Sequence, residues 1–446
     1  MRRSSVYKMH QKLITFGIRL ALCERVMKTI LRGSFCLLML LLTCRVGWAD
    51  APALSSWRSL LGYLDPRTWP FIPVPEVGTD PNGGTTVGIL PVFLFVNEHQ
   101  QVNRIVNGDL TYNSTLGIGG SLQILSYPSE DTYWSATAGA TEHLARTVDL
   151  FYSTGLTRDH GWSFEGRFLF DRDPTERFFG LGNRSKAGNE TNYTLEQEAV
   201  TARFGLNLTR QMQLALDLRP RSVDIQRGAF GTLPFVGTRF PQLKGLRRGS
   251  NELVNRLLLS YDTRNSLNVP TSGTFLSVWG GITGQQFLSS VSYSMFGLEA
   301  RHYRPLSPRF TLVGHLAARY MPVGRQAPFW ALSQLGGDRS EVGYRQPLRG
   351  FGAARFIDRN LFAANAELRS RVLEHDLFGT HAVLEIAPFI DLGRVFHRMD
   401  ENPLSGLHPV GGVGFRGIAA PFVVGYVDIG YGSEGVAFFS GVNYPF

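Results

Sequence analysis

The feature that most constrains the fold of this chain is a recurring alternation of apolar and polar residues. In one segment, four aromatic residues alternate with polar or charged ones: Trp162, Phe164, Phe168 and Phe170 against Ser163, Glu165, Arg167 and Asp171. The segments 200–208, 212–219 and 364–372 show the same pattern. Because successive side chains of a β-strand point to opposite faces, a period of two indicates strands with one apolar and one polar face. The sequence therefore predicts an all-β fold.

These segments continue without a visible boundary from Gly84 to Phe446. A soluble protein with this much sheet would be divided into sandwich domains, and no shift in composition marks a linker in this range. A closed membrane barrel instead satisfies every backbone donor and acceptor, and its side chains alternate between lipid and lumen. We therefore expect a transmembrane antiparallel β-barrel. Seventeen segments carry the pattern, and because single-chain bacterial barrels have an even number of strands, about 16 strands are expected.

The start of the chain has the features of an export signal. In residues 27–49, Lys28 and Arg32 precede an apolar run, Phe35–Leu42, which is followed by small residues at the end, Gly47 and Ala49. This order is typical of a secretory signal peptide. We expect residues 1–49 to be removed, with Met27 as a candidate for the true start. An N-terminal membrane anchor is the alternative, although the apolar run is shorter than the about 20 residues of a spanning helix.

Two further parts are expected after the signal peptide: a short periplasmic segment over residues 50–83 and the outer-membrane β-barrel over residues 84–446. The first 49 residues hold nine basic residues, one acid and all three cysteines, which leaves 36 Lys and Arg against 35 Asp and Glu in the rest. This balance gives no support for a nucleic-acid partner. A chain without cysteine beyond Cys44 also excludes disulfides and thiolate metal sites there. We expect no cofactor and no metal.

Arginine supplies nearly all of the positive charge of the expected barrel, where only Lys186 and Lys244 are lysines. Genomic base composition is one explanation of this bias. The other explanation is that inward-facing guanidinium groups pair with carboxylates across a polar lumen, because a planar fork fits a carboxylate better than an ammonium group does.

The end of the chain predicts a last strand over residues 436–446. Its apolar residues fall on one face and include the terminal aromatic residue: Val436, Phe438, Val442, Tyr444 and Phe446. Such an end resembles the C-terminal signal by which bacterial outer-membrane barrels are recognised for insertion. We therefore expect Tyr444 and Phe446 to serve as that signal and the protein to be integral to the bacterial outer membrane.

Several motifs follow one another in the C-terminal half: Leu335-Gly336-Gly337-Asp338, Leu348-Arg349-Gly350-Phe351, Glu367-Leu368-Arg369 and Phe389-Ile390-Asp391-Leu392-Gly393. They are preceded by Tyr261-Asp262-Thr263-Arg264 and Pro270-Thr271-Ser272-Gly273. Together they resemble the barrel domain of the BamA/TamA outer-membrane assembly superfamily, also called the bacterial surface antigen family. The resemblance implies a strand–turn–strand motif at Asp262, Arg264, Pro270 and Gly273. It also implies that the loop with Leu348, Arg349, Gly350 and Phe351 folds back into the barrel, where its arginine meets acidic residues of the inner wall.

The alternation suggests which acidic residues Arg349 meets. Glu367 lies on the polar face of its segment, and Asp391 sits among apolar neighbours in mid-strand, where a lipid-facing carboxylate would be costly. We therefore predict that Arg349 pairs with Asp391, with Glu367 as a second partner, and holds the loop from about residue 322 to residue 358 inside the lumen. The alternative is that these charges merely line a water-filled channel.

The resemblance implies a function in assembly or transport at the outer membrane. Family members that insert or thread substrates carry periplasmic POTRA modules before the barrel, and residues 50–83 are too few for one, so a POTRA-less member is expected. The expected activity is to assist insertion or translocation of a protein or lipid. The expected partners are outer-membrane lipid, the barrel assembly machinery during biogenesis and an unidentified protein or lipid substrate.

Three other functions stay open at this point. One is a passive solute pore, and another is a structural surface antigen. The third is an outer-membrane hydrolase, which would need a reactive side chain beside a histidine on the barrel rim. The local candidates for it are His143, Asp159, His160, His375 and Asp376, and each of them is more typical of a solvated loop, so we expect no enzyme activity.

Overall fold

The computed structural model describes residues 71–96, 102–129, 131–246, 249–285, 289–324, 326–341, 344–377, 380–419 and 423–446. All of them belong to one compact unit, residues 61–446. The expected signal peptide and residues 50–70 of the expected periplasmic segment lie outside the described residues. None of the helices in the described part is long and apolar enough to cross a membrane.

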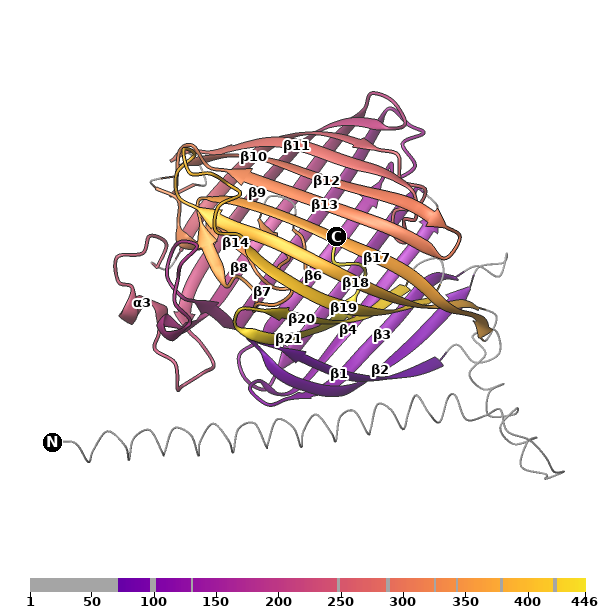
Figure 1. Ribbon diagram of the computed structural model, residues 1–446, viewed down its shortest axis with the longest axis horizontal. Helices are drawn as coiled ribbons and strands as arrows, with labels where there is room; N and C mark the ends of the chain where they lie inside the picture. Colours follow the sequence, from indigo (N-terminus) through magenta and orange to yellow (C-terminus); the bar gives the residue numbers. More distant parts are fainter. Residues whose placement is uncertain are drawn as a thin grey trace. The chain divides into compact units, whose positions relative to one another are not determined.

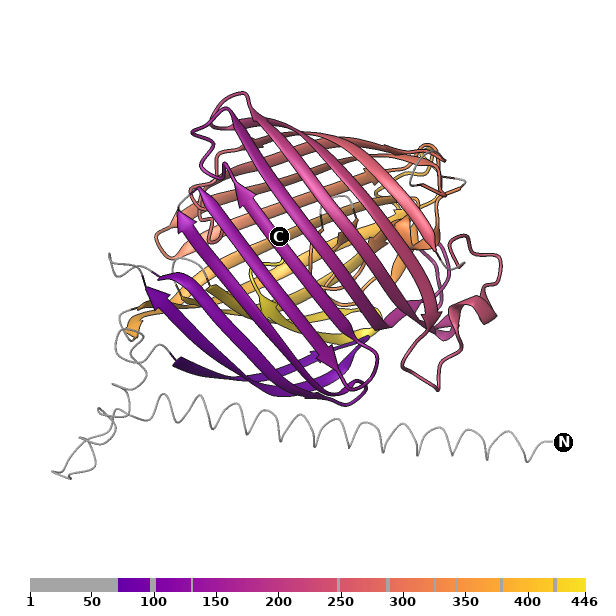
Figure 2. The same ribbon diagram turned by 180° about the vertical axis from the view of Figure 1, so that it is seen from behind.

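The described chain forms an antiparallel sheet of 18 strands, in which each strand pairs with its neighbours in sequence. The sheet curls into a barrel (Figures 1 and 2). Its strands are β1 (Phe71–Asp80), β2 (Gly84–Val96), β3 (Val102–Asn113), β4 (Gly117–Ser129), β5 (Thr132–Thr141), β6 (Arg146–Thr154), β7 (Trp162–Phe178), β8 (Thr191–Asn207), β9 (Met212–Arg227), β10 (Ser250–Asp262), β11 (Gly273–Thr283), β12 (Tyr293–Ser307), β13 (Phe310–Tyr320), β17 (Asn360–Leu377), β18 (Thr380–Phe396), β19 (His408–Ala419), β20 (Val423–Gly432) and β21 (Gly435–Val442).

The side chains alternate between the two faces of this sheet as the sequence predicts. In β10, Glu252 and Arg256 are buried on the inner face, whereas Leu257 is 55% exposed on the outer face. Inward arginines of neighbouring strands pair with inward acids: Arg203 and Arg256 both bind Asp217, at 2.5 and 2.8 Å. An apolar outer surface and a charged interior are what a barrel in lipid requires. The predicted transmembrane antiparallel β-barrel is therefore confirmed.

The number of strands differs from the expected 16. Each of the seventeen alternating segments forms a strand, and β1 adds one more in a part of the chain expected to precede the barrel. This strand contains Pro73 and Pro75, and proline cannot donate to a ladder, so a central position in the sheet would be unfavourable. The only ladder of β1 among the described residues is with β2, and prolines are tolerated on such an edge. The sheet thus begins at Phe71 rather than at Gly84.

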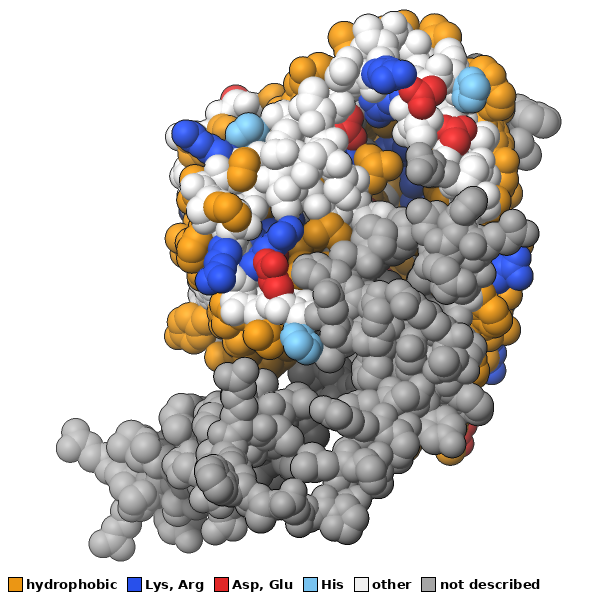
Figure 3. All heavy atoms as spheres, turned by 90° about the vertical axis from the view of Figure 1, so that its right-hand side faces the viewer, with side chains coloured by type: hydrophobic (Ala, Val, Ile, Leu, Met, Phe, Trp, Pro, Cys, Tyr) orange, Lys and Arg blue, Asp and Glu red, His pale blue; other side chains and the backbone are white. Residues whose placement is uncertain are grey.

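The two ends of the barrel differ in their connections. One end carries the long loops: 179–190, 228–249, 284–292, 321–359 and 397–407. The other end carries short turns, the start of β1 and the end of β21. Figure 3 views this second end, where charged side chains surround a hollow and hydrophobic side chains cover the flanks of the barrel. The long loops are therefore the part of the fold that can close the lumen.

The loop between β13 and β17 fills part of the lumen. It contains the short helix η2 (Phe329–Ala331) and a small sheet of β14 (Ser333–Leu335), β15 (Arg345–Gln346) and β16 (Phe356–Asp358). Two further helices of the described residues, η1 (Ala187–Asn189) and α3 (Val236–Arg239), lie in other long loops. Phe329 and Trp330 pack in a core with residues of β7 to β12, whereas Leu335 and Leu348 pack against β17, β18 and β19. The loop therefore bridges two sides of the barrel.

The end of the chain departs from its predicted strand. Val436 and Phe438 are exposed on the outer face as expected, at 57% and 40%, but β21 ends at Val442. Asn443 has a left-handed conformation, with φ of 74°, which turns the chain out of the strand. Phe446 then lies buried inside the barrel, with its ring stacked on His315 at 4.7 Å between centroids. The prediction of one continuous apolar face from Val436 to Phe446 is wrong.

This position makes Phe446 a stability determinant of the folded barrel. Phe446→Ala is expected to lower the free energy of unfolding by about 3 kcal/mol, because a buried aromatic side chain is lost and a cavity is left. Urea unfolding of barrel refolded in detergent micelles measures this loss without any cellular machinery. Phe438→Ala, on the outer face, is the matched control. Unchanged unfolding of the Phe446 variant together with failed assembly in cells would show that Phe446 acts only as a recognition signal.

Candidate functional site

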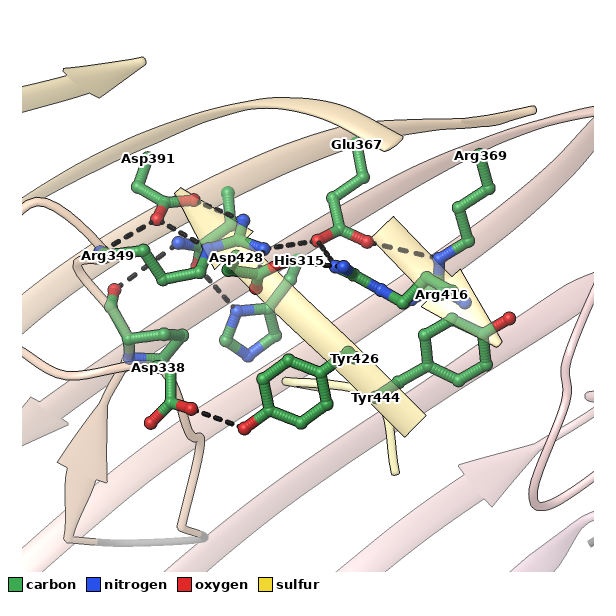
Figure 4. Close-up of polar contacts among 12 residues, drawn as sticks. His315, Asp338, Arg349, Glu367, Arg369, Asp391, Arg416, Tyr426, Asp428 and Tyr444 are labelled. Atoms are coloured by element: carbon green, nitrogen blue, oxygen red, sulfur yellow. Dashed lines mark hydrogen bonds and ion pairs between the residues drawn. The ribbon is translucent and has the colours of Figure 1, made fainter. Parts of the chain in front are cut away.

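The site lies where the tip of the 321–359 loop meets the inner wall formed by β17 to β20. We call this cluster of six buried charged side chains the lumenal lock: Arg349, Glu367, Arg369, Asp391, Arg416 and Asp428. The strand residues point inward because each occupies the inner-face phase of its strand, as the outward Ile390, Phe415 and Val427 show. Figure 4 shows Asp391, Glu367 and Asp428 around Arg349, with Arg416 and Arg369 on the far side of Glu367.

Each of the three guanidinium nitrogens of Arg349 donates to a carboxylate. Its Nε and Nη2 donate to the two carboxylate oxygens of Asp391, at 2.9 and 2.7 Å, and its backbone N–H donates to the same carboxylate at 3.0 Å. Its Nη1 donates to Glu367 and, at 3.1 Å, to Asp428. The guanidinium carbon also lies 3.5 Å from the centroid of the Phe389 ring. Bidentate, charge-assisted bonds of this kind fix both the position and the orientation of the loop.

Two further arginines, Arg369 and Arg416, bind the carboxylates that surround Arg349. Arg416 bridges Glu367 and Asp428, at 3.1 and 2.5 Å, and Arg369 donates from Nε to Glu367 at 3.1 Å. Three guanidinium groups thus face three carboxylates. Balanced pairing of this kind is what allows charges to be buried, since an unpaired buried charge costs several kcal/mol. The side chains of Arg349, Glu367, Asp391, Asp428 and Arg416 have 0% exposure, so the alternative of solvated charges lining a channel does not describe them.

Arg349 stays positively charged in the lock. Burial opposes the charged form of the guanidinium, but the attraction of Asp391 and Glu367 outweighs burial and holds the pKa of Arg349 well above its ordinary value. The lock therefore has no proton to exchange at Arg349. This arrangement is suited to holding the loop rather than to acid–base chemistry.

Glycines let the loop backbone touch the barrel wall directly. A Cβ atom on Gly430 would lie 1.9 Å from the carbonyl oxygen of Arg349, and one on Gly350 would lie 2.7 Å from the backbone nitrogen of Gly432. No side chain fits between two backbones at this distance. The glycine of the loop and the two glycines of β20 are therefore a matched set that seats Arg349 against its carboxylates.

Further bonds tie the rest of the loop to the wall. Asp338 accepts a hydrogen bond from the Tyr426 hydroxyl in β20. The Asn365 side chain in β17 donates to the carbonyl of Pro347 at 3.3 Å, and Arg355 pairs with Glu434 at 2.6 Å. The loop is thus held along its length and not at Arg349 alone.

The structure brings some of the sequence-predicted residues together. Arg349, Asp391 and Glu367 meet in the lock, while Leu348 and Phe351 pack in the apolar cluster beside it. Tyr444 also reaches this region, with the guanidinium carbon of Arg369 3.6 Å above its ring. Phe446 lies close by, its ring centroid 5.6 Å from the guanidinium carbon of Arg349. The inward turn of the chain end therefore brings to this region two residues that were expected on the same face of the last strand as Val436 and Phe438.

The strand–turn–strand residues lie elsewhere, in the turn between β10 and β11. Asp262 accepts two hydrogen bonds from the Arg264 guanidinium, at 2.9 and 2.7 Å, and Pro270 is buried. Gly273 has a φ of 103°, and a Cβ there would lie 2.2 Å from the Thr263 carbonyl oxygen. These residues shape a turn at the end opposite the long loops, and the described contacts give them no part in the lock.

Sequence reasoning missed Arg416, Asp428, Gly430 and Gly432. Asp428 carries the same signal that identified Asp391, a carboxylate in mid-strand between apolar neighbours. Its recognition would have completed the acidic set. Arg416 lies in a glycine-rich strand, where the alternation is weak because glycine marks neither face.

The hydrolase candidates lie in different turns and strands of the barrel. His143 lies between β5 and β6, Asp159 and His160 lie between β6 and β7, and His375 lies near the end of β17. Asp159 pairs with Arg210 at 2.9 Å. Among the described residues, no group of three or more His, Cys, Asp or Glu side chains could hold a metal ion. The lumenal lock is therefore the candidate functional site.

The chain matches a protein-family model and is similar to solved structures of outer-membrane proteins. The family model described as the Omp85 superfamily domain matches residues 131–438. No curated protein matches the chain. Among solved structures, the crystal structure of BamA from Haemophilus ducreyi lacking POTRA domains 1–3 is similar with a TM-score of 0.49 and 14% identity, over 89% of this chain and 79% of that one. CdiB from Escherichia coli is similar with a TM-score of 0.44 and 12% identity, over 84% of this chain and 62% of that one.

Proposed function

Because the chain belongs to the Omp85 superfamily, we propose that it assists the insertion or translocation of a protein or a lipid at the outer membrane. In this proposal the barrel is the working part, and its substrate is unidentified. The long loops face the outside of the cell and the short turns face the periplasm, as is general in bacterial outer-membrane barrels. A signal peptide over residues 1–49 would deliver the chain to that membrane.

The observation that carries the proposal is the junction between the first and last strands. β1 and β21 lie beside each other, yet among the described residues no ladder pairs one with the other. Unpaired strand edges readily accept another strand through backbone hydrogen bonds. A junction of this kind is where a substrate strand or a lipid could enter the barrel wall from the side.

The lumenal lock supports this function over a passive pore. The loop fills part of the lumen with an apolar core and with charges at 0% exposure. A solute pore needs a continuous water path, which such a loop obstructs. If the barrel is nevertheless a pore, it should conduct steadily in a planar bilayer, and deletion of residues 343–353 should enlarge the conductance.

The test of the function is a comparison of outer membranes from a strain lacking the gene and from its parent. We expect selective loss of one or a few proteins or lipids in quantitative mass spectrometry of isolated membranes. Unchanged membranes would contradict an assembly or transport role.

A crosslink tests whether the junction is the route. The chain has no cysteine beyond Cys44, so one cysteine placed in β1 and one in β21 would form a unique disulfide in the barrel. We expect the locked barrel to reproduce the membrane defect of the deletion strain and a reductant to relieve it. The matched control is Val427→Cys with Ser440→Cys, which are register partners of the intact β20–β21 ladder. Full function of the locked barrel would exclude the junction as the route.

A further inference from the structure

Four long loops enclose a second feature, a cavity of about 1140 Å³ at the end of the barrel away from the chain ends. Its walls come from the loops 179–190, 228–249, 321–359 and 397–407. Small-molecule sites usually occupy about 300–1,000 Å³, so this cavity can admit a sizeable ligand. The lumenal lock contributes none of its six residues to the lining.

One part of the cavity is apolar. Phe178, Phe329 and Phe396 line it and are almost fully buried, and Phe240 extends the same wall. The ring of Phe178 meets those of Phe240 and Phe329 edge to face, at 5.1 and 5.4 Å between centroids. Aromatic packing of this kind gives a rigid apolar wall.

Among the charged residues of the lining, cations are in excess. Five basic side chains line the cavity, against two carboxylates: Arg184, Lys186, Lys244, Arg359 and Arg394 against Asp358 and Glu401. Both lysines found after residue 49 are among them. Lysine is a compact point charge suited to phosphate, which separates these positions from the paired arginines of the lumen.

The two carboxylates are already engaged. Asp358 binds the ring of His397 at 3.0 Å, and Glu401 binds Arg394 at 2.9 Å. Within the described residues, Arg184, Lys186 and Arg359 have no carboxylate partner. Arg394 is 6% exposed, and its Nε has no hydrogen-bond partner in the described part of the chain. Positive charge is therefore in excess beside an apolar wall.

From this combination we propose that the cavity binds an anionic lipid through a phosphate headgroup. The phosphate lies among Lys186, Arg359 and their cationic neighbours, and the acyl part lies on the wall of Phe178 and Phe240. A phosphate with up to two negative charges matches the uncompensated cations better than a single carboxylate does. The site binds this lipid whatever substrate the barrel assists.

Calorimetry on barrel refolded in zwitterionic micelles tests the proposal with three probes. Dihexanoyl phosphatidic acid should bind with one site per barrel, and added salt should weaken the binding because the rim cations are exposed. Dihexanoyl phosphatidylcholine and inorganic phosphate should each bind at least tenfold more weakly. Equal binding of phosphatidylcholine would reduce the site to an apolar patch, and equal binding of inorganic phosphate would show a free-anion site. Either result overturns the proposal.

Two variants assign the binding to the cavity. Lys186→Gln combined with Arg359→Gln should weaken dihexanoyl phosphatidic acid about tenfold, and Phe240→Ser should weaken it without affecting the response to inorganic phosphate. The matched control is Arg398→Gln, an exposed arginine of the loop 397–407 that pairs with Asp400 outside the cavity lining. We expect the double variant to keep its fold, because neither Lys186 nor Arg359 has a carboxylate partner among the described residues. Heat-dependent gel migration verifies the fold. Unchanged affinity of the double variant would refute the site.

Discussion

Arg349→Ala should cost the barrel at least about 3–5 kcal/mol of unfolding free energy, the range for removing one partner of a buried ion pair. The truncation leaves the carboxylates of Asp391, Glu367 and Asp428 with only Arg416 and Arg369 to balance them. It also removes the two guanidinium bonds to Asp391 of β18 and leaves only the bond from the backbone N–H. We expect a low yield of folded barrel. In gels, the band of the folded barrel should disappear at a lower heating temperature than for the wild type.

Two companion variants make the result specific. Arg349→Lys keeps the charge but loses the bidentate fork, so its stability should fall between those of the wild type and Arg349→Ala. Arg398→Ala removes an exposed arginine paired with Asp400, and its effect should stay within about 0.5 kcal/mol. If Arg349→Ala folds with the same yield and heat resistance as the wild type, this residue does not hold the loop.

Gly430→Ala should lower the free energy of unfolding about as much as Arg349→Ala does, although it adds a single carbon. The new Cβ would lie 1.9 Å from the carbonyl oxygen of Arg349, and both sides of the contact are backbone, so neither can rotate away. Overpacking usually costs about 1–3 kcal/mol and occasionally more, and we expect the upper end or beyond. The loop tip should leave the wall, and trypsin should then cut at the arginines between residues 339 and 355.

Neighbouring glycines supply the control for this prediction. Gly411 and Gly417 lie in the adjacent strand β19, and a Cβ on either meets nothing within 4 Å. Alanine at these positions should be neutral, or stabilising by about 0.4–1 kcal/mol because it restricts the unfolded chain. Equal stability of Gly430→Ala and Gly411→Ala would mean that the loop does not rest on β20.

The strands were the most predictable part of the fold because their signal is local. A period of two needs only neighbouring residues, and each segment that showed it is a strand. β1 was not predicted. Its prolines are unfavourable in a central strand, although they are acceptable on an edge. The even-count rule was sound, but it required one more strand instead of one fewer.

The lumenal lock was only partly predictable because its members come from distant parts of the chain. Asp391 stood out as a mid-strand carboxylate, and the loop motif pointed to Arg349. Asp428 carries the same local signal as Asp391, but its pairing with Arg349 depends on the curvature of the sheet, which brings β19 and β20 around to the loop. The position of Arg416 depends on the same curvature. No local pattern contains that information. The inward turn after Val442 was equally hidden, because the apolar alternation continues through Tyr444 and Phe446 while the backbone at Asn443 does not.

The inward chain end has a practical consequence for handling the protein. Phe446 lies in the lumen beside His315, so an affinity tag fused to the C-terminus must either fit inside the barrel or pull the last residues out of it. The loop 397–407 offers a better point of insertion, because Met399 and Asp400 are exposed there. Epitopes placed in that loop would also report, by antibody labelling of intact cells, which end of the barrel faces outward.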